Sequence, residues 1–274
     1  MPTFDATKKD ALYCLFKGEP GTRKSTQALS FPKPILFASW DRKIDALGIP
    51  IHKWKINPKD VFYESLRTWT AGETLIKKLI VDPSYNGRRI NTFVIDTITT
   101  LVDSINKQTM KDKGYPNKVG SIAVNSIEDY KAEESALVDL IDWTKDIYEI
   151  HKVNIILIAH IIQKEMKSEG GKTHFSRTII TAGKAIAQKI PAKSDEVYHF
   201  NIQKGFDPSQ GGNYALLTTH TGDDFARTSL PLDKEITFGD EPLYEKWIAP
   251  AIQKYNSYFA QPTTQPTNEP KKAF

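Results

Sequence analysis

The segment LYCLFKGEPGTRKST, residues 12–26, decides how this chain folds. Residues 11–16 form a continuous apolar run that is too short for a helix and is soon followed by Gly18 and Pro20, which is typical of a buried parallel strand. A helix is predicted from Lys24 to about residue 30, because Pro32 and Pro34 prevent it from continuing. A strand, a glycine-containing turn and a helix N-terminus in this order predict a loop whose backbone N–H groups bind phosphate.

Every residue of the loop is a candidate for contact with a nucleotide: Gly18, Glu19, Pro20, Gly21, Thr22, Arg23, Lys24, Ser25 and Thr26. Lys24 would supply a positive charge for the outer phosphates, and the Ser25 hydroxyl would ligate Mg²⁺. The complete phosphate-loop pattern has glycine where this chain has Arg23, so the motif is one residue short. An arginine fits there if its φ is negative, as at a helix start, and its guanidinium can then reach phosphate.

Three further apolar runs end next to polar residues. Residues 35–38 precede Asp41, residues 90–96 end on Asp96, and residues 153–159 precede His160. Because ligands bind at the carboxyl ends of parallel strands, we expect these three side chains near the loop. Asp96 would then serve Mg²⁺, Asp41 would polarise the attacking water, and His160 would sense the terminal phosphate. The simpler alternatives are a turn cap for Asp41 and a surface histidine for His160.

The remaining patterns complete an α/β fold. Helices are predicted over residues 60–80, as one helix or two, and over residues 126–151. An antiparallel hairpin is predicted at residues 196–203 and 214–220, and a last amphipathic helix at residues 240–258. We therefore expect one domain over residues 1–259, with a mainly parallel sheet, helices on both faces and an antiparallel C-terminal edge. Residues 260–274, rich in Pro, Thr and Gln, are expected to be a disordered tether.

The composition narrows the class of protein. With 274 residues, 39% of them hydrophobic and 26% charged, the chain can form one large globular domain. The single cysteine, Cys14, excludes an intrachain disulfide and suits a reducing compartment. No run of 18 apolar residues occurs, so we expect no membrane span and a cytoplasmic location, the host cytoplasm if the protein is viral. The net charge of +4 is compatible with a polyanionic partner.

Two segments are rich in lysine and lack a clear period: residues 107–125 and residues 161–193. Glycines interrupt both of them, and few acidic residues offset their charge. The pattern predicts two basic, irregular segments.

The arrangement resembles the RecA-like P-loop ATPases of bacteriophages that are associated with single-strand annealing and recombination. The resemblance covers roughly residues 10–235 and rests on the motifs at residues 18–26, 94–99 and 156–160. It implies a RecA-like core that binds ATP and Mg²⁺ and acts on single-stranded DNA in recombination, annealing or replication. It also implies assembly into an oligomer or filament, and a single-strand-binding protein or another recombination protein as a partner.

The resemblance further implies which residues meet DNA, because segments 107–121 and 161–178 stand where this family has its DNA-binding loops. Basic residues there would track phosphates and two aromatic rings would stack on bases: Lys107, Lys111, Lys113, Tyr115, Lys118, Lys164, Lys167, Lys172, Phe175 and Arg177. Residues 225–231 are similar to the family's closing basic motif, which makes Arg227 a candidate finger for a neighbouring subunit's nucleotide. The family commonly has Glu where this chain has Asp41, so hydrolysis is expected to be slow.

Two other functions stay open at this stage. A nucleotide-dependent binding module would bind ATP without turnover, with Arg23 and Asp41 marking the lost hydrolysis. A small-molecule kinase would use the same loop but would need an arginine-rich lid, whereas the inserts of this chain are rich in lysine.

Overall fold

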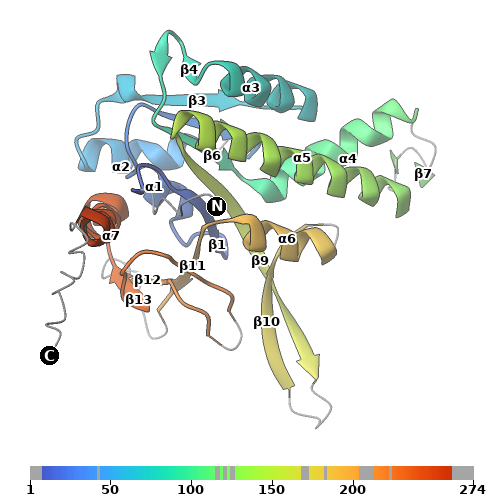
Figure 1. Ribbon diagram of the computed structural model, residues 1–274. Coiled ribbons are helices and arrows are strands. Elements are labelled where there is room, and N and C mark those ends of the chain that lie inside the picture. Colours follow the sequence, from blue (N-terminus) through green and yellow to red (C-terminus); the bar gives the residue numbers. More distant parts are fainter. Residues whose placement is uncertain are drawn as a thin grey trace, which may run out of the picture.

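A nine-stranded sheet organises the molecule (Figure 1). The computed structural model describes residues 8–41, 44–114, 118–119, 122–123, 127–167, 173–181, 184–203, 213–221 and 224–260. The sheet order is β13-β12-β11-β1-β9-β6-β2-β3, with β10 paired to β9. Its strands are β1 (Tyr13–Gly18), β2 (Ile35–Ser39), β3 (Val61–Ser65), β6 (Thr92–Asp96), β9 (Asn154–Lys167), β10 (Thr173–Ile179), β11 (Glu196–Ile202), β12 (Tyr214–Leu217) and β13 (Glu235–Phe238).

The sheet is parallel from β11 through β3 and antiparallel at the C-terminal edge, where β12 pairs with β11 and β13 pairs with β12. The predicted mainly parallel sheet with an antiparallel edge is therefore confirmed. Two short hairpins lie outside it: β4 (Ser84–Tyr85) with β5 (Arg88–Arg89), and β7 (Lys118–Val119) with β8 (Ile122–Ala123).

Helices cover both faces of the sheet, as predicted. They are α1 (Lys24–Ala28), α2 (Gly48–Lys53), α3 (Trp69–Val81), α4 (Ile98–Asp112), α5 (Ile127–His151), α6 (Lys184–Lys193) and α7 (Ala249–Ala260), with 3-10 turns at Ile44–Leu47 and Pro58–Asp60 and a π-helical turn at Tyr244–Ile248. Tyr13 and Leu15 of β1 pack in the core under α3, α4, α5 and α6, whereas Cys14 and Phe16 pack in the opposite core with α1 and α7. This alternation of side chains follows from the two-residue period of a strand. It makes β1 the central strand between two hydrophobic cores.

Residues 61–65 correct the sequence prediction, because they form strand β3 rather than the start of a helix. Val61, Phe62 and Tyr63 are β-branched or aromatic residues that favour a half-buried strand, and β3 pairs along the edge of β2. The helix begins only at α3, where the Thr68 hydroxyl accepts a hydrogen bond of 3.2 Å from the Ala71 N–H.

The two lysine-rich segments are also more regular than predicted. Residues 107–112 belong to α4, and the structure places residues 161–167 and 173–179 in the β9–β10 hairpin and residues 184–193 in α6. Strands β9 and β10 pair in antiparallel fashion from Ile161 opposite Ile179 to Lys167 opposite Thr173, and this pairing satisfies their backbone hydrogen-bonding groups. The sequence of this segment has no apolar period that would predict the pairing. The predicted tail beyond Ala260 lies outside the described residues. Within the described part of the chain, none of the helices has the length and apolar character that crossing a membrane requires.

Candidate functional site

Four parallel strands end at one cavity of about 250 Å³. Gly18 at the end of β1 lies beside His160 on β9, and Asp96 at the end of β6 lies between Ile158 and Ser39 of the neighbouring strands. The Trp40 N–H donates to the Asp96 carbonyl over 3.0 Å, which holds the end of β2 against β6. The cavity is lined by Pro20, Gly21, Thr22, Arg23, Lys24, Ser25, Thr26, Asp41, Asp96, Thr97, Ile158 and His160. The fold thus brings together the loop and the three strand ends that the sequence singled out.

Lys24 lies in the floor of this cavity with 4% of its surface exposed. Its ammonium donates to the carbonyls of Gly18 (2.9 Å) and Glu19 (2.7 Å) and lies 3.2 Å from the Thr22 hydroxyl. Burial lowers the pKa of Lys24 to about 8, although Asp96 and Glu19 attract the charged form. The lysine is therefore held in place by loop oxygens and remains protonated at neutral pH.

Two glycines give the loop its path. A side chain at Gly18 would bring its Cβ within 2.4 Å of the Phe200 carbonyl on β11, so the loop can pass β11 only without a side chain. Gly21 has a φ of +82°, in the left-handed region that favours glycine. The Thr22 hydroxyl closes the turn by donating to the Glu19 carbonyl over 2.8 Å.

The backbone conformation of Arg23 and the position of its guanidinium both differ from those considered in the sequence analysis. Its φ is +64°, so the condition of a negative φ, under which an arginine fits without strain, is not met. A positive φ favours glycine, the residue that the complete motif has at this position. The guanidinium donates to the Gly239 carbonyl over 3.0 Å and to the Asp240 carboxylate, and it lies 4.6 Å from the centre of the Tyr214 ring. These contacts at the β12–β13 edge hold the guanidinium, and they offset the backbone cost of an arginine at this position. The structure therefore does not support a phosphate contact by Arg23.

The N-terminus of α4 is fixed beside the same cavity. Thr97 caps the helix by accepting from the Thr100 N–H over 3.2 Å, and the Thr100 hydroxyl lies 3.4 Å from the Thr97 N–H in return. The His160 N–H donates to the Thr99 hydroxyl over 3.1 Å, which joins the end of β9 to the first turn of α4. The Thr99 and Thr100 hydroxyls thus make local hydrogen bonds at the start of α4. Thr97 also lines the cavity, but it was not predicted from the sequence as a site residue. Its position directly after Asp96 at the end of a strand could have indicated it.

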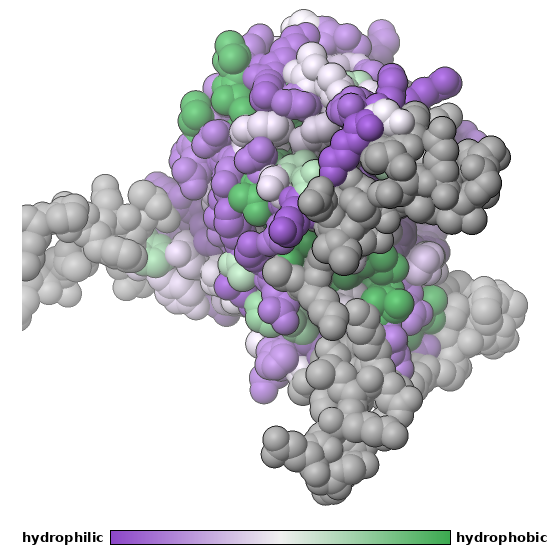
Figure 2. Space-filling view, turned by 90° about the vertical axis from the view of Figure 1, so that its right-hand side faces the viewer, coloured by the Kyte–Doolittle hydropathy of each residue, from purple (hydrophilic) through white to green (hydrophobic). Residues whose placement is uncertain are grey.

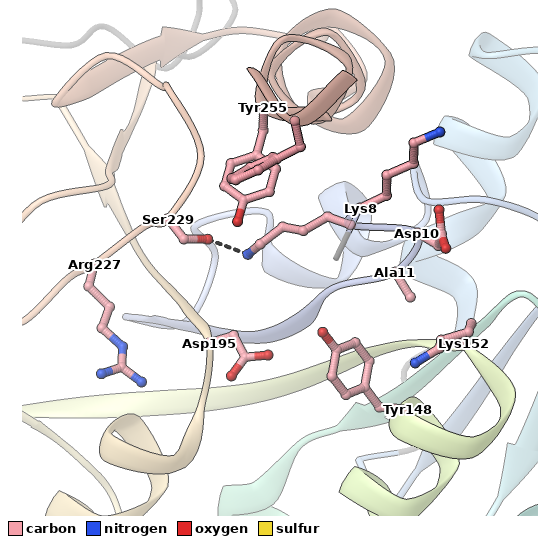
Figure 3. A pocket seen from close by; sticks show the side chains of 11 residues that line it. Lys8, Asp10, Ala11, Tyr148, Lys152, Asp195, Arg227, Ser229 and Tyr255 are labelled. Carbon is pink, nitrogen blue, oxygen red and sulfur yellow. Dashed lines mark hydrogen bonds between the residues drawn. The ribbon is translucent and has the colours of Figure 1, made fainter. Parts of the chain in front are cut away.

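A cavity of about 850 Å³ lies at the opposite ends of the strands (Figure 3). Lys8, Asp10 and Ala11 border it just before β1, and Asp195 borders it just before β11. Ligands of open α/β sheets bind at the carboxyl ends, so its size does not make it the main site.

Arg227 lies at this far cavity, and its guanidinium donates to the Ser194 and Ala192 carbonyls at the end of α6. It therefore caps a helix within its own subunit. Its predicted contact with a neighbouring subunit's nucleotide stays a prediction.

The predicted DNA-binding residues fall on two elements that project from the sheet at separate places (Figure 1). Lys107 and Lys111 lie on the last turns of α4, Lys113 follows it, and Lys118 lies on β7. Lys164 and Lys167 lie on β9 and Phe175 on β10, while Tyr115 and Lys172 fall outside the described residues.

Arg177 behaves differently from the other predicted DNA-binding residues, because its guanidinium pairs with the Asp224 carboxylate at 2.6 Å. The structure therefore does not support its prediction as a residue free to track phosphates.

Metal binding at the strand-end cavity would depend on few protein ligands. Ser25 and Asp96 both line it. No group of three or more His, Cys, Asp and Glu side chains able to hold a metal ion occurs among the residues that the structure describes. Mg²⁺ at nucleotide sites is usually held by one or two protein groups, with phosphate and water completing the shell, so this donor set fits it.

A family model described as an AAA domain matches residues 11–230, which begin just before β1 and end just after Arg227. No curated protein matches the chain. The matched span contains the loop and all the strand ends that line the 250 Å³ cavity.

Proposed function

The chain belongs to the AAA domain family of P-loop ATPases, and from this premise we propose that it binds ATP and Mg²⁺ in the strand-end cavity and hydrolyses the nucleotide. The observation that carries the proposal is the position of the Lys24 ammonium. It is buried in the cavity floor and held by neutral oxygens of the loop. Phosphate oxygens are stronger acceptors for a cation than carbonyl oxygens, so a bound nucleotide would compete well for this lysine.

Ser25 and Asp96 are the residues that would hold Mg²⁺, which when bound neutralises charge on the phosphate oxygens. We assign Asp41 to orienting the attacking water and His160 to sensing the terminal phosphate. The hydrogen bond from the His160 N–H to Thr99 gives a path from the nucleotide to α4.

The binding-module alternative is tested with Asp41→Ala. In the hydrolase proposal this variant loses turnover while it keeps ATP affinity. If wild type and variant show the same low turnover, and both bind ATP tightly, the chain is a nucleotide-dependent binding module instead.

We further propose that nucleotide binding is coupled to single-stranded DNA. The β9–β10 hairpin continues directly from His160, so a change at the terminal phosphate acts on the base of the element that carries Lys164 and Lys167. Basic side chains on a projecting hairpin suit the phosphate backbone of DNA. This proposal includes a role in phage recombination, annealing or replication. It also includes self-assembly and a single-strand-binding protein as a partner.

ATP turnover measured with and without single-stranded DNA tests the coupling. We expect stimulation in wild type and its loss in the double variant Lys164→Ala, Lys167→Ala. The matched control is Lys77→Ala, Lys246→Ala, which removes the same charge from lysines that pair with Glu73 and Glu241 elsewhere on the surface. Equal stimulation of all three proteins, or none in wild type at low salt, would contradict the DNA proposal and leave the nucleotide proposal standing.

A further inference from the structure

Lys17 is a buried cation that the nucleotide site does not use. It stands one residue before Gly18 on β1, and its side chain shares the face of Tyr13 and Leu15, away from α1. Only 2% of its surface is exposed. Among the residues that the structure describes, its ammonium has neither a hydrogen bond nor an ion pair, which is costly for a buried charge.

The described groups around Lys17 carry one positive charge more than they carry negative charges. His199 is its register partner on β11, and its Nδ1 lies 2.9 Å from the Asp224 carboxylate. Burial lowers the pKa of His199, so the imidazole is neutral at pH 7. Asp224 is already paired with the Arg177 guanidinium at 2.6 Å. Among the residues that the structure describes here, two cations, Lys17 and Arg177, therefore face one carboxylate.

A cavity of about 360 Å³ opens beside this cluster. Lys17 and Arg177 form its cationic side, and Ile179, Ala187, Pro191 and Phe225 are among its apolar walls. The side of the molecule that carries α6 and the hairpin is mainly hydrophilic, with hydrophobic side chains gathered below its middle (Figure 2). The volume lies in the range of small-molecule sites, whose walls are mostly apolar with a few polar groups.

We propose that this cavity, the Lys17 cavity, binds a small molecule with one carboxylate and an apolar body. The carboxylate pairs with the Lys17 ammonium, and the apolar body packs between α6, Ile179 and Phe225. A monocarboxylate balances the single excess charge, whereas a phosphate dianion would replace an unpaired cation by an unpaired anion. The site is separate from the nucleotide cavity, because none of the residues lining one lines the other.

The test uses hexanoate as the probe and hexanol as its neutral match, without nucleotide. Thermal unfolding and calorimetric titration are measured for wild type, Lys17→Met, Ala187→Leu and the control Lys189→Met, an α6 lysine that pairs with Glu134. We expect hexanoate to raise the melting temperature of wild type and Lys189→Met as its concentration rises. Its affinity should fall about 10–100-fold in Lys17→Met, the ratio expected for loss of a charged hydrogen bond.

Ala187→Leu keeps Lys17 and fills the cavity, so it should lose hexanoate binding even if Lys17→Met folds poorly. Equal effects of hexanoate and hexanol on wild type, or equal hexanoate affinity in wild type and Lys17→Met, would overturn the proposal. Binding of inorganic phosphate that depends on Lys17 and exceeds that of hexanoate would overturn it in favour of a phosphate site. Because no nucleotide is present, failure here leaves the ATP proposal untouched.

Discussion

Lys17 and Lys24 belong to the same strand–loop unit and are buried to a similar degree. They differ in the groups that pair with their positive charges. Both are almost fully buried, with 2% and 4% of their surfaces exposed, and burial lowers the pKa of each to about 8. Lys24 donates to loop oxygens, whereas within the described part of the chain Lys17 has only the electrostatic attraction of Asp224, which Arg177 shares. This difference between their partners shows that burial alone does not determine the role of a lysine. The acceptors that the fold supplies decide whether its charge is already satisfied or still needs a ligand.

The largest expected effect is on ATP turnover, because we expect hydrolysis to take place only in the cavity that Lys24 lines. Asp96→Asn keeps the shape of the side chain but removes the charge beside Lys24, so ATP turnover should fall about 10²–10³-fold. Steady-state ATP hydrolysis measures this. Asp103→Asn on the exposed face of α4 is the matched control and should turn over like wild type. Normal turnover in Asp96→Asn would show that the Asp96 carboxylate has no role in hydrolysis.

The second expected effect is on stability and differs between the two lysines. Lys17→Met removes an unpaired buried charge and should raise the free energy of unfolding by about 1–3 kcal/mol. Lys24→Met removes a charge too, but it leaves the Gly18 and Glu19 carbonyls without their donor, which costs about 1–3 kcal/mol and cancels the gain. Urea unfolding of both variants measures the difference. A destabilised Lys17→Met would indicate that Lys17 already has a partner in solution.

A smaller effect follows from the titration of Lys17. Its pKa is lowered from 10.5 to about 8, so between these values the unfolded chain binds more protons than the folded chain. Lys17 therefore contributes a rise in the free energy of unfolding with pH across this window, and Lys24 contributes in the same direction, whereas Cys14, whose pKa burial raises, opposes them at the upper end. His199, Asp224 and Arg177 face Lys17, and the pKa values of His199 and Asp224 are lowered, so these two groups titrate below the window.

Lys17→Met should remove the part of the rise that Lys17 contributes, so the slope with pH should be smaller in the variant than in wild type. Urea unfolding at pH 7, 8, 9 and 10 measures both slopes. An unchanged pH profile in the variant would show that Lys17 keeps an ordinary pKa and is not a buried, unpaired cation.

The smallest effect is expected at Arg23, where two contributions oppose each other. Arg23→Gly relieves a residue with φ of +64° but loses the contacts with Asp240 and Tyr214. The net change in the free energy of unfolding should stay within about 1 kcal/mol. ATP affinity should stay near that of wild type, since the guanidinium is held at the β12–β13 edge. A large loss of ATP affinity would show that Arg23 leaves Asp240 when nucleotide binds.

The sequence predicted the nucleotide cavity better than it predicted the elements around it. Asp41, Asp96 and His160 follow strongly apolar strands, and parallel strands necessarily place their ends together. Residues 61–65 were assigned to a helix because they adjoin the helical period of α3, and only pairing with β2 reveals the strand. The hairpin of β9 and β10 was missed because its residues show no clear apolar period in the sequence, and the pairing of the two strands is seen only in the structure.

Lys17 and Arg23 show what sequence patterns cannot reveal. A lysine at the end of an apolar strand gives no sign of whether its side chain reaches water, and only the packing of α6, β10 and β11 buries it. The conformation of Arg23 depends on Asp240 and Tyr214, which are far from it in the chain and have no motif of their own. In both cases contacts distant in sequence determine the environment of the charge.

Equilibrium titration of Mg·ATP into wild type, Lys17→Met and Lys24→Met tests most directly whether the two lysines serve two sites. We predict one nucleotide per chain in wild type and Lys17→Met with similar affinity, and binding weakened at least about 10–100-fold in Lys24→Met. Unchanged ATP affinity in Lys24→Met, or an equal loss in Lys17→Met, would contradict the assignment of the nucleotide to the Lys24 cavity alone.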